Sequence, residues 1–212
     1  MRSVASHFFS QLSTLSHELI PMFQHITVLF SFVFAIALTH VLSCVSKLIL
    51  ARDRVRFSGL HALWMLNALM LLLINWLSLW LLEAIKHWSV GEIMVQLGWA
   101  IPQYFTCSLI SMPVGNDEAI DMRAFYERQR PVLFSAFAVT YAMSMVANFA
   151  DRNNLEGWKP GDWIGADILV LPMLIAALVA GWAKPRWLRW TVAWFGLALQ
   201  SWFLISSYTL AI

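Results

Sequence analysis

Six long apolar segments make up most of this sequence and leave little of it for anything else. They are Ile26–Leu50, Leu60–Leu82, Ile93–Val114, Pro131–Ala150, Trp163–Trp182 and Leu188–Leu210. About 20 apolar residues are needed to cross a hydrocarbon core of roughly 30 Å. Each segment is long enough to do so. The sequence therefore predicts a chain whose main partner is the lipid bilayer.

The composition and length of the chain limit the fold that these segments can form. Hydrophobic residues are 60% of the 212 residues and charged residues only 12%, which is unusual for a soluble domain. Backbone amides find no water inside a bilayer, so continuous apolar runs of this length form helices. We predict an all-α, polytopic membrane protein in which residues 26–212 form one domain, a bundle of six transmembrane helices. Residues 1–25 contain polar residues throughout and are expected to form an N-terminal interfacial segment.

Lys and Arg residues are distributed unevenly between the two sides of these segments. The first, third and fifth connections carry Lys47, Arg52, Arg54, Arg56, Arg123, Arg128, Arg130, Lys184, Arg186 and Arg189. The opposite side carries only Arg2, Lys86, Arg152 and Lys159. Cytoplasmic connections of membrane proteins are enriched in Lys and Arg. We therefore expect these three connections in the cytoplasm, both termini outside it, and a location in the inner membrane of a bacterium.

Polar side chains form one stripe on the first segment and another on the second. Thr39, His40 and Ser43 lie in the first segment, and Asn67 and Asn75 lie in the second. Polar residues inside spans are costly and often functional, so the stripes predict a shared interior interface. That interface would be a hydrated path or a proton-sensitive site around His40 and Asn67, because histidine changes charge near neutral pH. The alternative is that these groups only form hydrogen bonds between helices.

Asp167, His61 and Cys44 are further polar or ionisable residues in the apolar segments. Asp167 lies about one turn inside the outer end of the fifth segment, where it would either guard a vestibule or reach the headgroups. His61, at the inner end of the second segment, is expected to be interfacial. His40 and Cys44 are four residues apart, but two potential ligands do not complete a metal site. We expect no metal and no cofactor.

The third connection, residues 119–129, is the only sizeable cytoplasmic feature. It mixes apolar and charged residues, which predicts a short helix either at the membrane surface or as an extension of the fourth segment. Phe125, Tyr126 and Arg128 are the candidates for contact with a cytoplasmic protein partner, whose identity the sequence does not indicate. The other reading of this segment is a solvated connector.

Residues 30–39 of the first segment read FSFVFAIALT. This run resembles the first helix of the bacterial relatives of the endolysosomal potassium channels, which are six-helix proteins of similar length. The motif of that family begins with Phe-Ser-Asp; Phe30 and Ser31 match it, whereas Phe32 stands in place of the aspartate. The resemblance implies a tetramer with a central pore lined by Ile36 and its helical neighbours.

The sequence excludes some classes of function more clearly than it selects one. It contains no phosphate-binding glycine loop, no paired histidines around a glutamate and no nucleophile elbow, so no catalytic residue is predicted. A net charge of +2 without a long basic run does not indicate nucleic-acid binding. The leading hypothesis is a homo-oligomeric channel or transporter for a cation or small solute. The alternative is a non-transport sensor or assembly partner that acts through residues 119–129.

Overall fold

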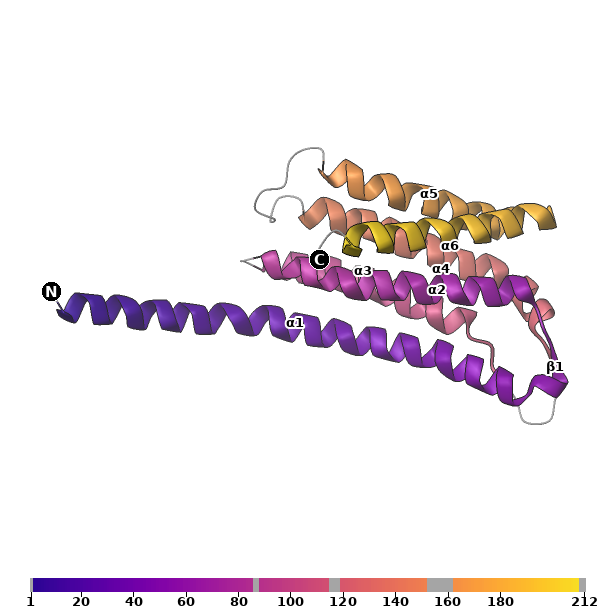
Figure 1. Ribbon diagram of the computed structural model, residues 1–212, viewed down its shortest axis with the longest axis horizontal. Helices are drawn as coiled ribbons and strands as arrows, with labels where there is room; N and C mark the ends of the chain where they lie inside the picture. Colours follow the sequence, from indigo (N-terminus) through magenta and orange to yellow (C-terminus); the bar gives the residue numbers. More distant parts are fainter. Residues whose placement is uncertain (1, 86–87, 115–118, 152–161, 210–212) are drawn as a thin grey trace.

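The computed structural model describes residues 2–85, 88–114, 119–151 and 162–209, and this part of the chain is almost entirely helical. Its helices are α1 (Arg2–Leu50), α2 (Gly59–Ser78), α3 (Val90–Ile110), α4 (Met122–Asp151), α5 (Asp162–Trp182) and α6 (Arg186–Thr209). The connections contain two 3-10 turns, η1 (Arg52–Arg54) and η2 (Leu79–Ala84), and two short strands, β1 (Val55–Arg56) and β2 (Ile120–Asp121). The helices lie side by side and alternate in direction (Figure 1). The all-α prediction is confirmed.

Within the described residues, four helical stretches are long and apolar enough to cross a membrane. They are Phe23–Leu50, Gly59–Ser78, Val90–Ile110 and Met122–Ala150, and a shorter apolar stretch, Asp167–Trp182, lies in α5. Large apolar side chains are exposed on the outside of these helices, among them Phe32, Ile36, Leu66, Ile101, Phe105, Val139 and Ile175. Soluble proteins rarely expose apolar surface of this extent, whereas lipid accepts it. These features are those of a multi-pass helical membrane protein.

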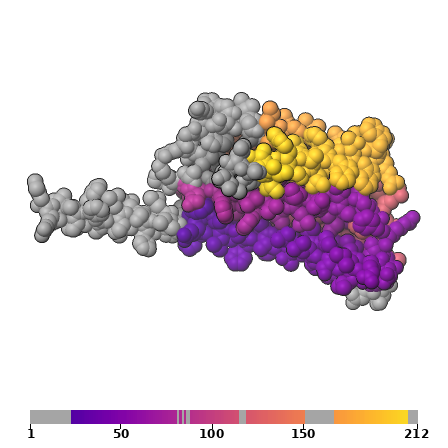
Figure 2. Space-filling model, viewed as in Figure 1, coloured from indigo at the N-terminus to yellow at the C-terminus, as the bar shows by residue number. Residues whose placement is uncertain are grey.

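The first helix is longer than the first apolar segment. α1 is continuous from Arg2 to Leu50, and its N-terminal part extends past the ends of the other helices (Figure 1). The part from Phe23 onward covers one side of the bundle along its length (Figure 2). The separate interfacial role of residues 1–25 stays a prediction.

The helices pack in an order that differs from their order in the chain. α4 packs against α3 and α5, and α6 packs against α2 and α5. α1 packs mainly against α3 and less extensively against α2. Small residues allow some of these contacts: a Cβ on Gly181 of α5 would lie 3.0 Å from the Cβ of Phe134 on α4. The interior of the bundle is therefore built from α2 to α6, with α1 on its outside.

The two strands join the first and third connections at one end of the bundle. They pair in parallel, with Val55 opposite Ile120 and Arg56 opposite Asp121. The fifth connection lies at the same end, because Arg130 of α4 donates from Nη1 to the carbonyl oxygen of Ala183 at 3.2 Å. We call this the basic end, since all three basic connections meet there.

The segment 119–129 takes one of its two expected forms. α4 begins at Met122 and runs without interruption into the fourth apolar segment, so the segment extends that helix and does not form a separate surface helix. Pro131, the expected start of the fourth segment, consequently lies inside α4.

Candidate functional site

A partly open cavity of about 210 Å³ lies in the half of the bundle remote from the basic end. Its walls come from the second halves of α2, α4 and α6, the first halves of α3 and α5, and η2. The lining is mainly apolar, and its polar members are Asn75, Ser78, Gln96, Tyr141, Ser144, Asn148 and Gln200. Among the described residues, no Asp, Glu, Lys, Arg or His side chain lines it. The described lining is thus apolar with a few uncharged hydrogen-bonding groups.

One wall of the cavity is held by side-chain amides on α2, α3 and α6. Asn75 donates from Nδ2 to Oε1 of Gln103 at 3.1 Å, which ties α2 to α3. Gln200 donates from Nε2 to Oδ1 of Asn67 at 3.2 Å, which ties α6 to α2. Asn67 is fixed in turn, because its Nδ2 donates to the carbonyl oxygens of Leu63 at 2.8 Å and Ala193 at 3.2 Å. These bonds set the orientation of the amides that face the cavity.

The opposite wall is held by bonds between α3, α4 and α5. The indole of Trp99 donates to Oγ of Ser144 at 2.9 Å. Asn148 donates from Nδ2 to Oδ1 of Asp167 at 2.9 Å. Asp167 therefore lies behind a lining residue and fixes its amide, although it does not itself line the cavity.

Two buried polar atoms at the cavity have no hydrogen-bond partner in the described part of the chain. They are the hydroxyl oxygen of Tyr141, whose side chain is only 3% exposed, and Oε1 of Gln200. An unsatisfied polar atom in a dry interior costs about 1–3 kcal/mol. Both atoms belong to residues that line the cavity, and a molecule that formed a hydrogen bond to either would remove this cost.

Aromatic side chains fill the bundle between the cavity and the basic end. The ring of Trp64 meets the rings of Phe134 and Phe137 edge-on, with centroid distances of 4.6 and 5.4 Å. Phe137 also stacks on Tyr141 at 6.3 Å. Edge-to-face and offset contacts at these distances are the favourable arrangements of aromatic rings. A packed aromatic cluster on α2 and α4 therefore lies between the cavity and the basic end.

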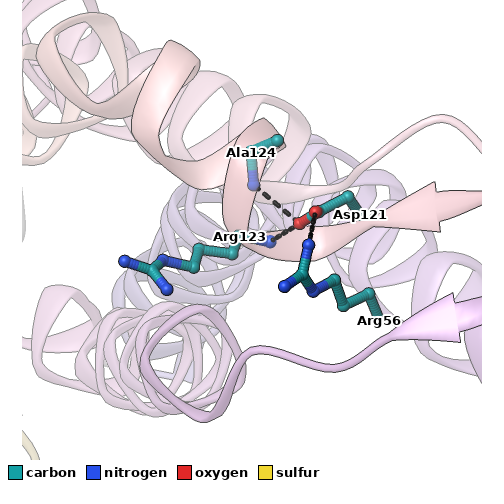
Figure 3. A network of polar contacts seen from close by, with 4 residues as sticks. All are labelled: Arg56, Asp121, Arg123 and Ala124. Carbon is teal, nitrogen blue, oxygen red and sulfur yellow. Dashed lines mark hydrogen bonds and ion pairs between the residues drawn. The ribbon is translucent and has the colours of Figure 1, made fainter.

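Asp121 fastens two connections together at the basic end (Figure 3). Its Oδ1 accepts from the backbone amides of Arg123 and Ala124, both at 2.9 Å, as the N-cap of α4. Its Oδ2 accepts from Nη1 of Arg56 at 3.3 Å. The amide of Ala124 first, and then the Arg123 amide and the Arg56 guanidinium, hold the pKa of Asp121 below its ordinary value.

A second charged cluster joins α4 and α6 at this end. Arg189, only 8% exposed, donates from Nη1 to Oε1 of Glu127. Arg130 lies 3.6 Å from the other oxygen of the same carboxylate. Glu127 thus neutralises a guanidinium that is almost completely removed from solvent.

The two polar stripes expected to share an interface face different helices. His40 is half-buried, and its Nε2 lies 3.4 Å from the hydroxyl of Tyr104 on α3, whereas Asn67 is buried against α6. Thr39 and Ser43 are exposed on α1. The prediction that His40 and Asn67 share an interface is therefore wrong, because α1 packs mainly on α3 and Asn67 faces α6.

Two expectations about the basic end are also corrected. Tyr126, expected to contact a protein partner, is 1% exposed, and its ring packs against Phe134 and His61. Phe125 is half-buried and stacks on His61 at 5.5 Å, which leaves Arg128 as the exposed candidate. His61, expected to be an exposed interfacial residue, is fully buried in the bundle and donates from Nε2 to the carbonyl oxygen of Ile110 at 2.8 Å.

Three buried glutamines were not among the sequence candidates. Gln96 and Gln103 lie in α3, and Gln200 lies in α6. Their signal was available, since a glutamine within an apolar segment is as unusual as the asparagines of the second segment. In the described ranges, no three His, Cys, Asp or Glu side chains are grouped so that they could hold a metal ion.

No protein-family model matches this chain, and no curated protein or solved structure is significantly similar to it. Its class therefore rests on its own fold, a multi-pass helical bundle with a cavity between its helices.

Proposed function

We propose that the protein is a membrane carrier that binds a small uncharged solute in this cavity. The observation that supports this is a cavity walled by five of the helices and lined by apolar, amide and hydroxyl groups. Ligand sites are typically concave, mostly apolar and furnished with a few fixed polar groups. Sites between the helices of a bundle are a common example.

The cavity chemistry favours a neutral solute over a cation. Cation-selective sites in membranes use rings of carboxylates or converging backbone carbonyl groups. The described lining offers neither carboxylates nor other charged side chains. A desolvated ion would therefore lack a counter-charge there.

We place the protein in the inner membrane of a bacterium with all six helices crossing, both termini outside and the basic end in the cytoplasm. The alternating directions of α1 to α6 and the cationic connections support this orientation. The cavity then lies in the outer half of the bundle, and the aromatic cluster lies between it and the cytoplasm. Pro102 in α3 and Pro172 in α5 lie in cavity-lining helices, where a missing amide permits bending.

Flux through proteoliposomes tests the carrier. Vesicles containing the purified protein should take up labelled glycerol, erythritol or 4-hydroxybenzyl alcohol faster than protein-free vesicles, without conducting K⁺. Ala147→Phe places a ring in the cavity wall and should slow uptake of the transported solute at least about tenfold. The ring would overpack the occupied cavity, which costs about 1–3 kcal/mol of solute binding. Ala142→Phe, on the exposed face of the same helix, is the matched control and should transport normally. A K⁺ current, or no neutral flux, would overturn the proposal.

A second candidate is a pore between copies of the chain, favoured by polar groups on the outer face of α1. Ala35, Thr39 and Ser43 are exposed at a spacing of four residues. Small residues at this spacing are typical of helix contacts in membranes. Ser43→Cys should form disulfide-linked dimers in membranes, and planar bilayers should show a conductance. Val139→Cys, exposed on α4, is the control, and a monomeric, non-conducting protein would sink this candidate.

A further inference from the structure

The unsatisfied polar atoms of the cavity indicate which group its ligand presents. We infer that the cavity binds a neutral ring-containing alcohol of about 8–10 non-hydrogen atoms, whose hydroxyl donates to Oε1 of Gln200. This inference rests on the proposed carrier function and names the class of its solute.

Gln200 lines the cavity and carries an acceptor that is held in a fixed orientation. Its Nε2 is engaged by Oδ1 of Asn67, and Asn67 is itself held by two backbone carbonyl groups. The amide of Gln200 therefore cannot turn without losing that bond. Its Oε1 is left buried and without a partner among the residues that the structure describes. A ligand that donates an O–H to this atom removes the cost of leaving it unsatisfied.

The other amide and indole groups of the lining reinforce this preference for a donor. Asn75, Asn148 and Trp99 each direct an N–H to a protein acceptor, respectively Gln103, Asp167 and Ser144. The indole N–H of Trp99 and one N–H of each asparagine amide are thus occupied by the protein itself. Tyr141 adds a buried hydroxyl on the α4 wall that is free to bond a polar ligand group.

The shape and charge of the site define the rest of the ligand. Trp99, Tyr141 and Phe203 supply aromatic surface to a mainly apolar lining, which suits a ring. A dry cavity of about 150 Å³ holds benzene, so the 210 Å³ found here corresponds to about 8–10 non-hydrogen atoms. A charged ligand would lose its hydration without gaining a counter-ion from the described lining.

Equilibrium binding to the full-length protein in nanodiscs, with empty nanodiscs as the blank, tests the inference with three related probes. 2-Phenylethanol carries the hydroxyl, ethylbenzene lacks it, and phenylacetate is an anion of similar size. The wild type should bind 2-phenylethanol about 5- to 10-fold more tightly than ethylbenzene, the equivalent of one hydrogen bond of about 1–1.5 kcal/mol. Phenylacetate should not bind.

Two variants identify the groups that recognise the hydroxyl. Gln200→Leu should reduce the affinity ratio of 2-phenylethanol to ethylbenzene to about one. Tyr141→Phe keeps the Asn67–Gln200 bond, so it tests the site even where Gln200→Leu does not fold, and it should weaken 2-phenylethanol binding. Tyr104→Phe, which removes a hydroxyl on the α1 side of α3, is the matched control and should bind as the wild type does.

The outcomes distinguish a failure of this inference from a failure of the proposed carrier function. Equal binding of 2-phenylethanol and ethylbenzene, tighter binding of phenylacetate, no binding of any probe, or a preference that survives both cavity variants would each overturn the inference. Selective binding without neutral-solute flux would support the inference and overturn the carrier. Neutral-solute flux without the hydroxyl preference would do the reverse.

Discussion

Replacing Gly196 by alanine tests the close contact between α2 and α6 that positions Gln200. A Cβ at this position would lie 2.8 Å from Oδ1 of Asn67, closer than real Cβ atoms approach an oxygen. Asn67 cannot move aside freely, because it donates to the carbonyl oxygens of Leu63 and Ala193 and accepts from Gln200. The two helices must therefore separate, or the asparagine must give up bonds.

Both responses lower the free energy of unfolding. Overpacking of a core costs about 1–3 kcal/mol, and an interhelical hydrogen bond in a membrane protein is worth about 0.6 kcal/mol. We expect Gly196→Ala to destabilise the protein by about 1–3 kcal/mol, with the upper end reached where the Gln200–Asn67 bond also breaks. The double variant Asn67→Ala, Gly196→Ala should lose less than the sum of the single losses, because the clashing oxygen is absent.

Denaturation with SDS in mixed micelles, followed by the loss of helical circular dichroism, measures these differences. Gly91→Ala is the matched control, since the nearest atom to its Cβ is Oγ of Ser89 at 3.8 Å. Alanine there should be neutral or stabilise α3 by up to about 1 kcal/mol. A Gly196→Ala protein as stable as the wild type, or strict additivity in the double variant, would refute the reasoning.

Three further predictions concern charged and polar contacts and use the same unfolding measurement. The depressed pKa of Asp121 gives stability that is present above the ordinary carboxyl pKa and is lost as pH falls through the lower folded value. Between pH 6 and pH 3 the wild type should therefore lose more stability than Asp121→Asn. Parallel stability–pH profiles of the two proteins would contradict a stabilising role of the Asp121 carboxylate as the N-cap of α4. Glu127→Gln removes the carboxylate partner of the buried Arg189 and should cost about 1–3 kcal/mol, whereas the exposed Glu83→Gln should change little. Thr140→Val removes the hydroxyl that lies 3.1 Å from Oγ1 of Thr106 and should cost about 0.6 kcal/mol; a stabilised variant would contradict this.

The sequence predicted the helices well, because the physical cause of each helix lies within its own segment. Apolar runs of sufficient length require helices in lipid wherever their neighbours lie. The basic residues likewise predicted a single charged end, and the β1–β2 pair joins two of the three basic connections.

The neighbours of each helix could not be predicted in the same way. Spacing shows that His40 and Ser43 share a face of α1, but it does not show which helix that face meets. His40 meets Tyr104 on α3, and Asn67 meets Gln200 on α6, a residue 133 positions away in the chain. Tyr126 was misjudged for a related reason: α4 begins at Met122, so a residue in an apparent surface connection lies one turn inside the bundle. The cavity depends on such long-range pairings and has no local signal.

The parallel pairing of β1 with β2 has a consequence for how the molecule assembles. β2 follows α3 in the chain, so a growing chain can form this pair only once α1, α2 and α3 have been made. The pair then brings the start of α4 beside the start of α2 and closes the first four helices into one unit. α5 and α6 join that unit last, and α6 completes it by placing Gln200 against Asn67. Since α5 and α6 both wall the cavity, its walls are complete only after the last helix has been made.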